Sequence, residues 1–191
     1  MQPFAVEYYR DMYEKSVTCS DLWRIKAKTL FNAASMLKPE VHRIWSDITF
    51  GRRQYSTEER EIAGVYLMLA GMAIENLLKG ILVIVEPAIV KPNYKLDWKN
   101  TGGNKHDLIA LWQSVGITLN NDETILLQKF TNHILWDGRF PVPKMAIDNP
   151  LDGSFTPFFL EDEQSFEEMF DKVESIYHHL FVEWYCEISS S

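Results

Sequence analysis

The segment Tyr66-Leu-Met-Leu-Ala-Gly-Met-Ala-Ile-Glu-Asn-Leu-Leu-Lys79 decides the fold, because it is an apolar helix pattern interrupted by two charges. Glu75 and Lys79 are four residues apart, so a helix places them on one face. Charged side chains are rarely buried without a partner. The pattern predicts a polar pair on a largely buried surface, which either fastens a bundle together or belongs to a site. The residues around the pair are typical of a buried helix: Leu67, Leu69, Ala70, Ala73, Leu77, Leu78, Ile81, Leu82 and Val83.

The totals predict one soluble domain spanning 1–191, with its core at about 21–187. The chain has 191 residues, of which 46% are hydrophobic and 13% aromatic, which is ample for a core. Its two cysteines, Cys19 and Cys186, cannot form a disulfide framework, so we expect free thiols in a reducing compartment. The first residues lack the pattern of a signal peptide. The longest uncharged run of the apolar helix, Ile62 to Ile74, is shorter than the roughly 20 residues of a membrane span. We therefore expect a cytoplasmic protein without a membrane partner.

The negative charge is concentrated in the last segment. Residues 161–191 hold nine acids and one base, Lys172, which accounts for the whole net charge of −8, and residues 1–160 are neutral. A field that attracts phosphate over the whole surface is therefore not expected, although a local basic cleft in the neutral part is compatible with these charges. The acidic run itself is either a solvated helix face or a surface for a protein partner.

Helical spacing dominates the chain and predicts four long helices. The first is expected at 21–37. The second begins at a capping box formed by Ser56 and Glu59 and ends before Pro87, and the third begins at a second capping box at Asn120 and ends at Asp137. The fourth follows the final apolar repeat. That repeat consists of Phe166, Phe170, Val173, Tyr177, Leu180 and Trp184.

Shorter elements are expected between the long helices. Pro39 should interrupt the first helix before a short one over 41–48. In the first helix we expect six residues to face inward, namely Leu22, Ile25, Leu30, Ala33, Ala34 and Leu37. Another short helix is expected over 105–115, closed by Gly116, and 138–160 reads as a long proline-rich loop. No convincing alternating strand pattern is present. The expected fold is an all-α, up-and-down bundle of four long helices plus short helices and this loop.

Three stretches in this order resemble the HEPN superfamily of small helical-bundle proteins. Ala70–Gly80 looks like the family's A-x-E-x-x-L-K helix, and Lys105–Leu111 is similar to its H-D-L-x-x-L opening of the next helix. Phe130–Pro143 resembles the end of the following helix, where an arginine sits beside an aromatic residue and a proline. The resemblance covers roughly 56–145.

The resemblance implies an up-and-down bundle that pairs as a homodimer. Active members are metal-independent ribonucleases of bacterial toxin–antitoxin and phage-defence systems, and their signature is an arginine, four to six residues, and a histidine. This chain departs from that signature. The positions after Arg139 hold Lys144, Met145 and Ala146, and the windows after the other six arginines also lack histidine. The ribonuclease role therefore does not carry over, whereas the fold, the dimer and a binding cleft near Arg139 do.

The charged pair, together with His106 and Asp107, gives four candidates for a ligand site. If Glu75 and Lys79 are buried, they need further partners such as Arg139 or His106. His106 stands at a predicted helix start, where Asp107 suits the positive end of the helix dipole. Each of these residues has a structural interpretation beside the functional one, as a bundle clasp or as a helix cap.

His133 and Arg139 are the sharpest catalytic candidates, and Asp137 and Arg139 are also candidates for binding a ligand. His133 shares a helix face with Asp137, and Arg139 follows the helix end. A histidine beside a carboxylate could act as a base, with Arg139 as a phosphate clamp. A satisfied helix histidine and a loop-anchoring arginine explain the same residues equally.

The leading hypothesis is a HEPN-like binding or regulatory module without the nuclease signature, in a prokaryotic defence or toxin–antitoxin system. RNA or a nucleotide would be its ligand in a local cleft. One alternative is a metal-independent ribonuclease that uses His133 and Arg139. A second is a structural, oligomer-forming protein with the acidic last helix as its partner surface. Because no Glu-x-x-His or His-Glu-x-x-His spacing occurs, neither a metal nor another cofactor is expected.

Overall fold

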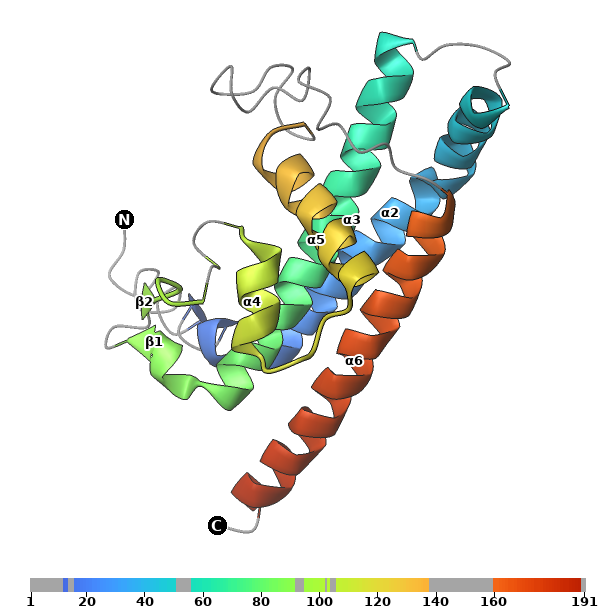
Figure 1. Ribbon diagram of the computed structural model, residues 1–191. Coiled ribbons are helices and arrows are strands. Elements are labelled where there is room, and N and C mark those ends of the chain that lie inside the picture. Colours follow the sequence, from blue (N-terminus) through green and yellow to red (C-terminus); the bar gives the residue numbers. More distant parts are fainter. Residues whose placement is uncertain are drawn as a thin grey trace, which may run out of the picture.

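The computed structural model is an all-α bundle, as expected, and describes residues 12–13, 16–50, 56–91, 95–101, 103, 106–137 and 160–189 (Figure 1). Its long helices are α2 (Ser20–Thr49), α3 (Thr57–Val85), α5 (Asn121–Asn132) and α6 (Leu160–Ser189). Its short elements are the 3-10 helix η1 (Pro87–Ile89), strands β1 (Val90–Lys91) and β2 (Lys95–Leu96), α4 (Leu108–Ser114) and the π-helix η3 (His133–Asp137). The predicted loop at 138–160 lies outside the described residues except for Leu160, which begins α6.

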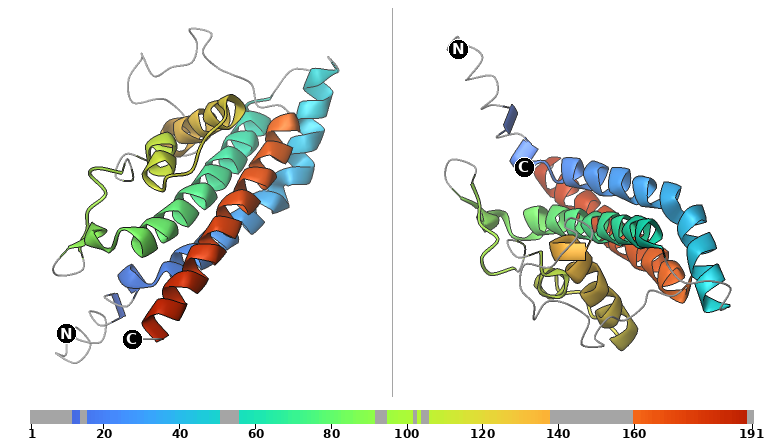
Figure 2. Two further views of the ribbon diagram at one scale, coloured as in Figure 1. Left: turned by 60° about the horizontal axis from the view of Figure 1, so that its bottom comes forward. Right: turned by 90° about the horizontal axis from the view of Figure 1, so that it is seen from above.

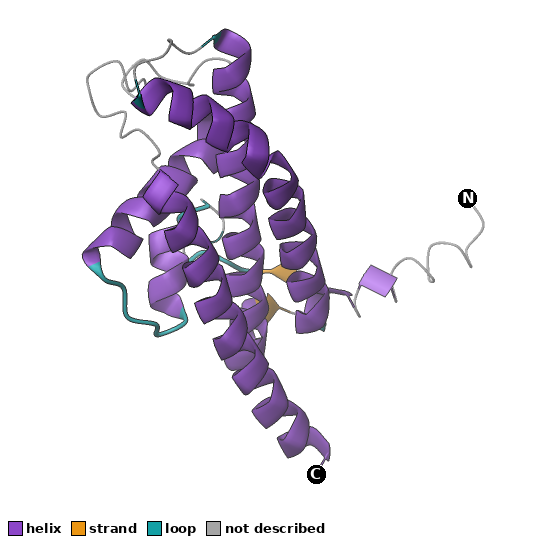
Figure 3. Ribbon diagram, turned by 90° about the vertical axis from the view of Figure 1, so that its right-hand side faces the viewer, coloured by secondary structure: helices purple, strands orange, loops and turns teal. Residues whose placement is uncertain are grey.

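Helix α3 is the centre of the bundle and contacts every other described long helix. Helices α2 and α6 lie along one side of α3, and α4 and α5 cover the other side (Figures 1 and 2). The last turns of α6 extend past the neighbouring helices (Figure 3). One hydrophobic cluster joins all these elements, so the described residues share a single core.

Helix α2 differs from its prediction at Pro39. The expected break is absent, because α2 runs without interruption from Ser20 to Thr49 with Pro39 inside it. A proline in a helix removes one hydrogen bond and bends the helix, but packing on both sides can preserve the helical path. Val41, Ile44 and Trp45 are buried beyond the proline, and α2 turns in this part (Figure 2). The burial of these side chains in the bundle therefore outweighs the cost of placing Pro39 inside a helix.

The inward face of α2 also differs from the prediction. Leu22 and Ile25 are 44% and 48% exposed, so the expectation that they face inward was wrong. The buried stripe follows Ala27, Leu30 and Ala34, so the expectation is confirmed for Leu30 and Ala34. Small side chains let α2 approach α3 closely, and this choice of face leaves Leu22 and Ile25 on the opposite side.

Both predicted capping boxes are confirmed. The Ser56 hydroxyl accepts from the Glu59 backbone N–H at 3.2 Å, and the Glu59 carboxylate accepts from the Ser56 backbone N–H at 3.2 Å. Asn120 and Glu123 make the same reciprocal pair at 2.8 Å. Gly116 follows α4 with a φ of 73°, the left-handed conformation that favours glycine. Local chemistry therefore fixes these helix ends.

Several predicted boundaries need correction. Helix α4 begins at Leu108 and not at Lys105, because Asp107 is its extended N-cap residue. The α-helical hydrogen bonds of α5 end at Asn132, and the chain continues to Asp137 as the π-helix η3. The described residues also contain a small antiparallel sheet that pairs Val90 with Leu96. Strands of two residues are too short to produce an alternating pattern.

Aromatic rings fill the part of the core that surrounds Phe166 of α6. The Phe166 ring lies 5.4 Å from Phe31, 6.5 Å from Tyr66, 5.5 Å from Phe130 and 6.3 Å from Phe170, measured between centroids. These rings come from four helices, so Phe166 ties the bundle together.

Gly71 lets η3 and the end of α5 sit against α3. A Cβ atom at Gly71 would lie 2.9 Å from both Ile134 Cδ1 and Phe130 Cβ, which is too close for a side chain. The glycine therefore sets the spacing on which the position of His133 depends.

The segment Glu61–Val85 of α3 is long and apolar enough to cross a membrane by length and composition, and 61% of its most apolar window is buried in the bundle. The core helix of a soluble protein passes the same test. The apolar character of α3 is therefore weak support for a membrane span.

Candidate functional site

The Glu75–Lys79 pair is buried on α3. The Glu75 side chain is 4% exposed and the Lys79 side chain 12%, and Lys79 Nζ lies 2.5 Å from Glu75 Oε1. The spacing of four residues in an otherwise apolar helix creates this pair. Taking two charges out of water is costly, and further hydrogen bonds are needed to offset the cost.

His106 supplies the further hydrogen bond. Its Nδ1 lies 3.0 Å from Glu75 Oε1 and 3.0 Å from Oε2. Because an ionised carboxylate only accepts, Nδ1 carries the proton and donates. The His106 side chain is 37% exposed, so the ring spans the distance from the buried carboxylate to the surface. Of the two partners that the sequence suggests for a buried pair, His106 is the one seen here, and Arg139 lies outside the described residues.

The backbone of His106 is held in an unfavourable conformation. Among the described residues it is the only non-glycine with a positive φ, at 55°. Such a conformation is costly for a residue with a side chain and persists only where the surroundings impose it. The contact with Glu75 and the start of α4 two residues later provide that constraint.

Trp98 and Gly103 complete the surroundings of Lys79. Lys79 Nζ lies 5.3 Å from the centroid of the Trp98 ring, within the range of a cation–π contact. The Trp98 ring in turn meets the edge of Trp23 at 5.8 Å. A Cβ at Gly103 would be 3.1 Å from Trp98 Cβ and 3.2 Å from Lys79 Cε, so only glycine fits there without displacement. The segment after β2 therefore packs directly on the buried pair.

The surroundings of Glu75 have opposing effects on its pKa. Burial raises the pKa of the carboxyl, whereas the hydrogen bond from His106 and the charge and hydrogen bond of Lys79 lower it. The net result is a pKa below the usual value of 4.5. Glu75 is therefore the ionised centre of the cluster, which we define as Glu75, Lys79, His106 and Trp98.

This pKa predicts how stability depends on pH. Because the folded-state pKa of Glu75 lies below 4.5, its contribution to stability is fully present above pH 4.5 and is lost as pH falls through the folded value. Glu75→Gln lacks this titration. We expect the difference in unfolding free energy between wild type and Glu75→Gln to be constant well above pH 4.5 and to narrow below it. Equilibrium denaturation over a pH series measures this, and a difference that widens on acidification would contradict it.

Asp107 and Thr131 fix the start of α4 beside the cluster. The Asp107 carboxylate accepts from the backbone N–H of Ala110 at 3.0 Å, which is an N-cap contact. The Thr131 hydroxyl of α5 accepts from the Leu108 backbone N–H at 3.3 Å. Asp107, a ligand candidate in the sequence, thus serves as a helix cap in the structure.

His133 is placed by other contacts on η3. It is 9% exposed, and its Nδ1 donates to the backbone carbonyl of Lys129 at 2.8 Å. Lys129 Nζ pairs with Asp162 of α6 at 2.8 Å. The backbone of Asp137 ends η3, whereas Arg139 lies outside the described residues. The sequence candidates thus fall into two groups. Glu75, Lys79 and His106 are brought together by α3 and the segment before α4, whereas His133 and the Asp137 backbone belong to η3.

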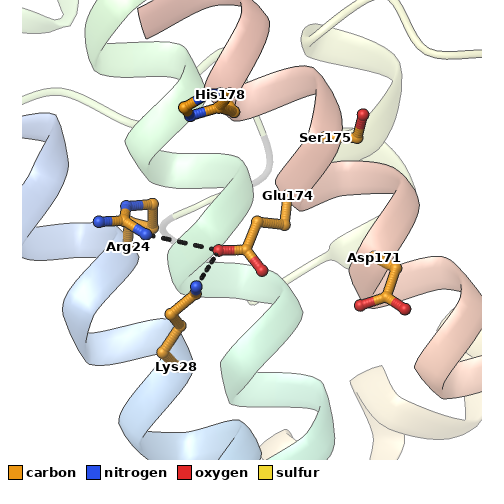
Figure 4. Close-up of a pocket in the computed structure, with 6 residues that line it drawn as sticks. All are labelled: Arg24, Lys28, Asp171, Glu174, Ser175 and His178. Carbon is orange, nitrogen blue, oxygen red and sulfur yellow. Dashed lines mark hydrogen bonds and ion pairs between the residues drawn. The ribbon is translucent and has the colours of Figure 1, made fainter.

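A groove of about 420 Å³ lies between α2 and α6 (Figure 4). Glu174 Oε1 in this groove lies 3.5 Å from Arg24 Nη1 and 2.5 Å from Lys28 Nζ. Two bases therefore face two acids, so the groove has no net positive charge to attract an anion. Its lining residues are Arg24, Lys28, Asp171, Glu174, Ser175 and His178. In the part of the chain that the structure describes, no group of three His, Cys, Asp or Glu side chains is arranged to hold a metal.

The sequence did not reveal the roles of Trp98 and Gly103. Trp98 stands in a loop without periodicity, and Gly103 belongs to a glycine pair that lacks the spacing of a phosphate loop. The only feature of the sequence that pointed to these two residues was their position shortly before the stretch Lys105–Leu111. Their function depends on the path of the loop back to α3, which local sequence does not determine.

At the centre of the cluster, the two carboxylate oxygens of Glu75 accept hydrogen bonds from Lys79 and His106. Such an arrangement can hold a loop against a helix. For proton transfer, only the outward part of the His106 ring remains, since Glu75 is already engaged on both oxygens. A scan of protein-family models and searches of curated proteins and of solved structures gave no match to this chain.

Proposed function

We propose that this protein is a HEPN-like bundle that works by binding, without ribonuclease activity. The observation that carries the proposal is that no arginine is followed by a histidine after four to six intervening residues, although the three HEPN-like stretches occur in order. A ribonuclease of this kind needs the histidine for proton transfer and the arginine for the charge on phosphate. The proposed ligand is RNA or a nucleotide, and the proposed setting is a prokaryotic defence or toxin–antitoxin system.

The geometry of the cluster supports the same proposal. The site residue with the deepest burial, Glu75, is 3% exposed and has both oxygens hydrogen-bonded within the chain. We interpret the cluster as a clasp that holds the segment between β2 and α4 on α3. A protein built in this way presents a fixed surface for binding.

A second candidate is a ribonuclease that uses His133 and Arg139. The observation in its favour is that η3 begins at His133, because π-helical turns frequently occur at functional sites. The hydrogen bond to the Lys129 carbonyl also assigns the proton to Nδ1 and leaves the lone pair on Nε2, as a general base requires.

Incubation of the purified protein with labelled RNA in the presence of a chelator separates the two candidates. We expect fluorescence anisotropy to report binding while the RNA stays at full length. Wild type, His133→Ala and Arg139→Ala should all give intact RNA. Cleavage by wild type that disappears in His133→Ala, with an unchanged thermal melt, would overturn the proposal and support the ribonuclease. Absence of RNA and nucleotide binding would also overturn it.

A further inference from the structure

The small sheet carries a pair of facing lysines that the clasp does not explain. In the antiparallel register, Lys91 of β1 lies opposite Lys95 of β2, and both residues are exposed. Directly opposite residues point to the same face of a sheet, with their Cβ atoms about 4.5–5.5 Å apart. Like charges in this arrangement destabilise a strand pair. The fold therefore gains nothing from the two positive charges, and a ligand of opposite charge would explain them.

The lysines of this segment have no acid partner among the residues that the structure describes. Lys91, Lys95 and the exposed Lys99, which follows β2, make no ion pair there. Asp97 stands between Lys95 and Lys99, and its Oδ1 accepts from the Lys99 backbone N–H at 3.2 Å. The acid nearest in sequence is thus engaged with the backbone of the turn. The three ammonium groups can therefore bind an anion that comes from outside the chain.

Positive charge is concentrated in this segment, whereas negative charge is concentrated on α6. Residues 87–105 hold one acid, Asp97, and the four bases Lys91, Lys95, Lys99 and Lys105, which gives a net charge of +3. Residues 161–191 have a net charge of −8. The sheet follows the end of α3 and lies apart from α6 (Figures 1 and 2). Because salt screens exposed charges beyond roughly 8–10 Å, a polyanion near the sheet is attracted by the lysines more than it is repelled by α6.

The clasp holds the lysine-bearing segment in place. The Asp97 backbone N–H donates to the Ile89 carbonyl at 2.9 Å, beside the paired strands. The next residue is Trp98, whose ring lies 5.3 Å from Lys79 Nζ, and Gly103 packs closely on both side chains. A surface that is ordered before its ligand arrives loses less conformational entropy on binding. The buried cluster therefore orders the backbone that carries the lysines.

We infer that Lys91, Lys95 and Lys99, which we call the lysine platform, bind the phosphate backbone of an RNA strand. The inference rests on the proposed function, because it names the surface on which the proposed RNA binds. Each ammonium stands on a flexible four-carbon stem, so lysines on two strands and on the following turn can contact successive phosphates. Contacts to phosphate carry no sequence information. RNA should therefore bind without base preference, and a mononucleotide should bind much more weakly than a strand.

Two double variants with the same change in net charge test the lysine platform. Lys91→Gln/Lys95→Gln removes the facing lysines. The matched control is Lys28→Gln/Lys38→Gln on α2, whose side chains are 46% and 34% exposed and each pair with an acid of α6. Because those lysines are already neutralised, they should contribute little to the attraction of phosphate. Fluorescence anisotropy with a labelled single-stranded RNA measures the affinity of each protein over a series of salt concentrations.

We expect only the platform variant to lose affinity. Loss of two phosphate contacts to a single strand should reduce the slope of log K against log salt concentration by about 1.4, which corresponds to about 25-fold weaker binding at 0.1 M salt relative to a 1 M reference. The control should bind RNA like wild type. The melting temperature of Lys91→Gln/Lys95→Gln should not fall, because removal of two facing like charges does not destabilise a strand pair.

The other outcomes would overturn the inference in distinguishable ways. Equal losses in the two double variants, or wild-type affinity in Lys91→Gln/Lys95→Gln, would overturn the lysine platform and leave the proposed function standing. Weaker binding that comes with a lower melting temperature would assign these lysines to the fold and would also overturn it. A wild type that binds neither RNA nor a nucleotide would overturn the proposed function, and the inference with it.

Discussion

Glu75→Gln is expected to lower the free energy of unfolding by about 3–5 kcal/mol at neutral pH. The substitution keeps the size of the side chain but removes the only acid that Lys79 pairs with among the described contacts. The Lys79 side chain is 12% exposed, so its ammonium would then be a largely buried charge beside a neutral amide and the Trp98 ring. His106 would lose the ionised acceptor that holds its strained backbone, and it would share the single carbonyl oxygen of glutamine with Lys79. Equilibrium denaturation at one fixed protein concentration measures the loss.

The matched control for this variant is Glu183→Gln on α6. Glu183 Oε1 lies 3.2 Å from His179 Nε2 at the same i, i+4 spacing, but the Glu183 side chain is 58% exposed. Exposed pairs of this kind contribute at most about 1 kcal/mol. Equal losses for the two variants would mean that burial of the Glu75 pair has no energetic consequence, and the interpretation as a clasp would fail.

Phe166→Ala is expected to cost about 3–5 kcal/mol, because a large buried ring is lost and the cavity cannot close. Phe166 is 2% exposed and touches rings from α2, α3, α5 and its own helix. Each of those rings is fixed by its own helix, so relaxation into the cavity is limited. A chemical denaturation curve with an unchanged slope would show that the loss belongs to the native state.

Phe50→Ala is the control for the loss of a phenylalanine ring. Phe50 follows the end of α2 and is 69% exposed, so its removal should change stability by less than about 1 kcal/mol. A loss for Phe166→Ala no larger than this would contradict the role of Phe166 as the link between the helices.

The long helices could be predicted because periodicity and capping chemistry are local signals. The two capping boxes, Gly116 and the buried repeat from Phe166 to Tyr177 all lie where the sequence places them. The prediction that the helix breaks at Pro39 was wrong, because the burial of Val41 and Ile44 outweighs the effect of a local helix breaker. Leu22 and Ile25 were misplaced for a related reason. An amphipathic pattern does not say which of two apolar faces the rest of the bundle covers.

The candidate site could be predicted only in part. The sequence identified Glu75 and Lys79 as a buried pair and named His106 among their partners, since charges in an apolar helix must be neutralised. It could not supply the left-handed backbone of His106 or the contact of Trp98 with Lys79. Both depend on how the loop between β2 and α4 returns to α3. That path is set by tertiary packing and not by any motif.

The most direct test of the central claim is a double-mutant cycle between Glu75→Gln and His106→Ala. His106→Ala changes the backbone strain by the same amount in wild type and in Glu75→Gln. The strain therefore cancels in the cycle, and only the interaction of the two side chains remains. If the cluster is a clasp, the unfolding free energies should show a coupling of about 1–3 kcal/mol. Additive effects, with a coupling near zero, would mean that His106 does not hold its loop through Glu75 and would contradict the account.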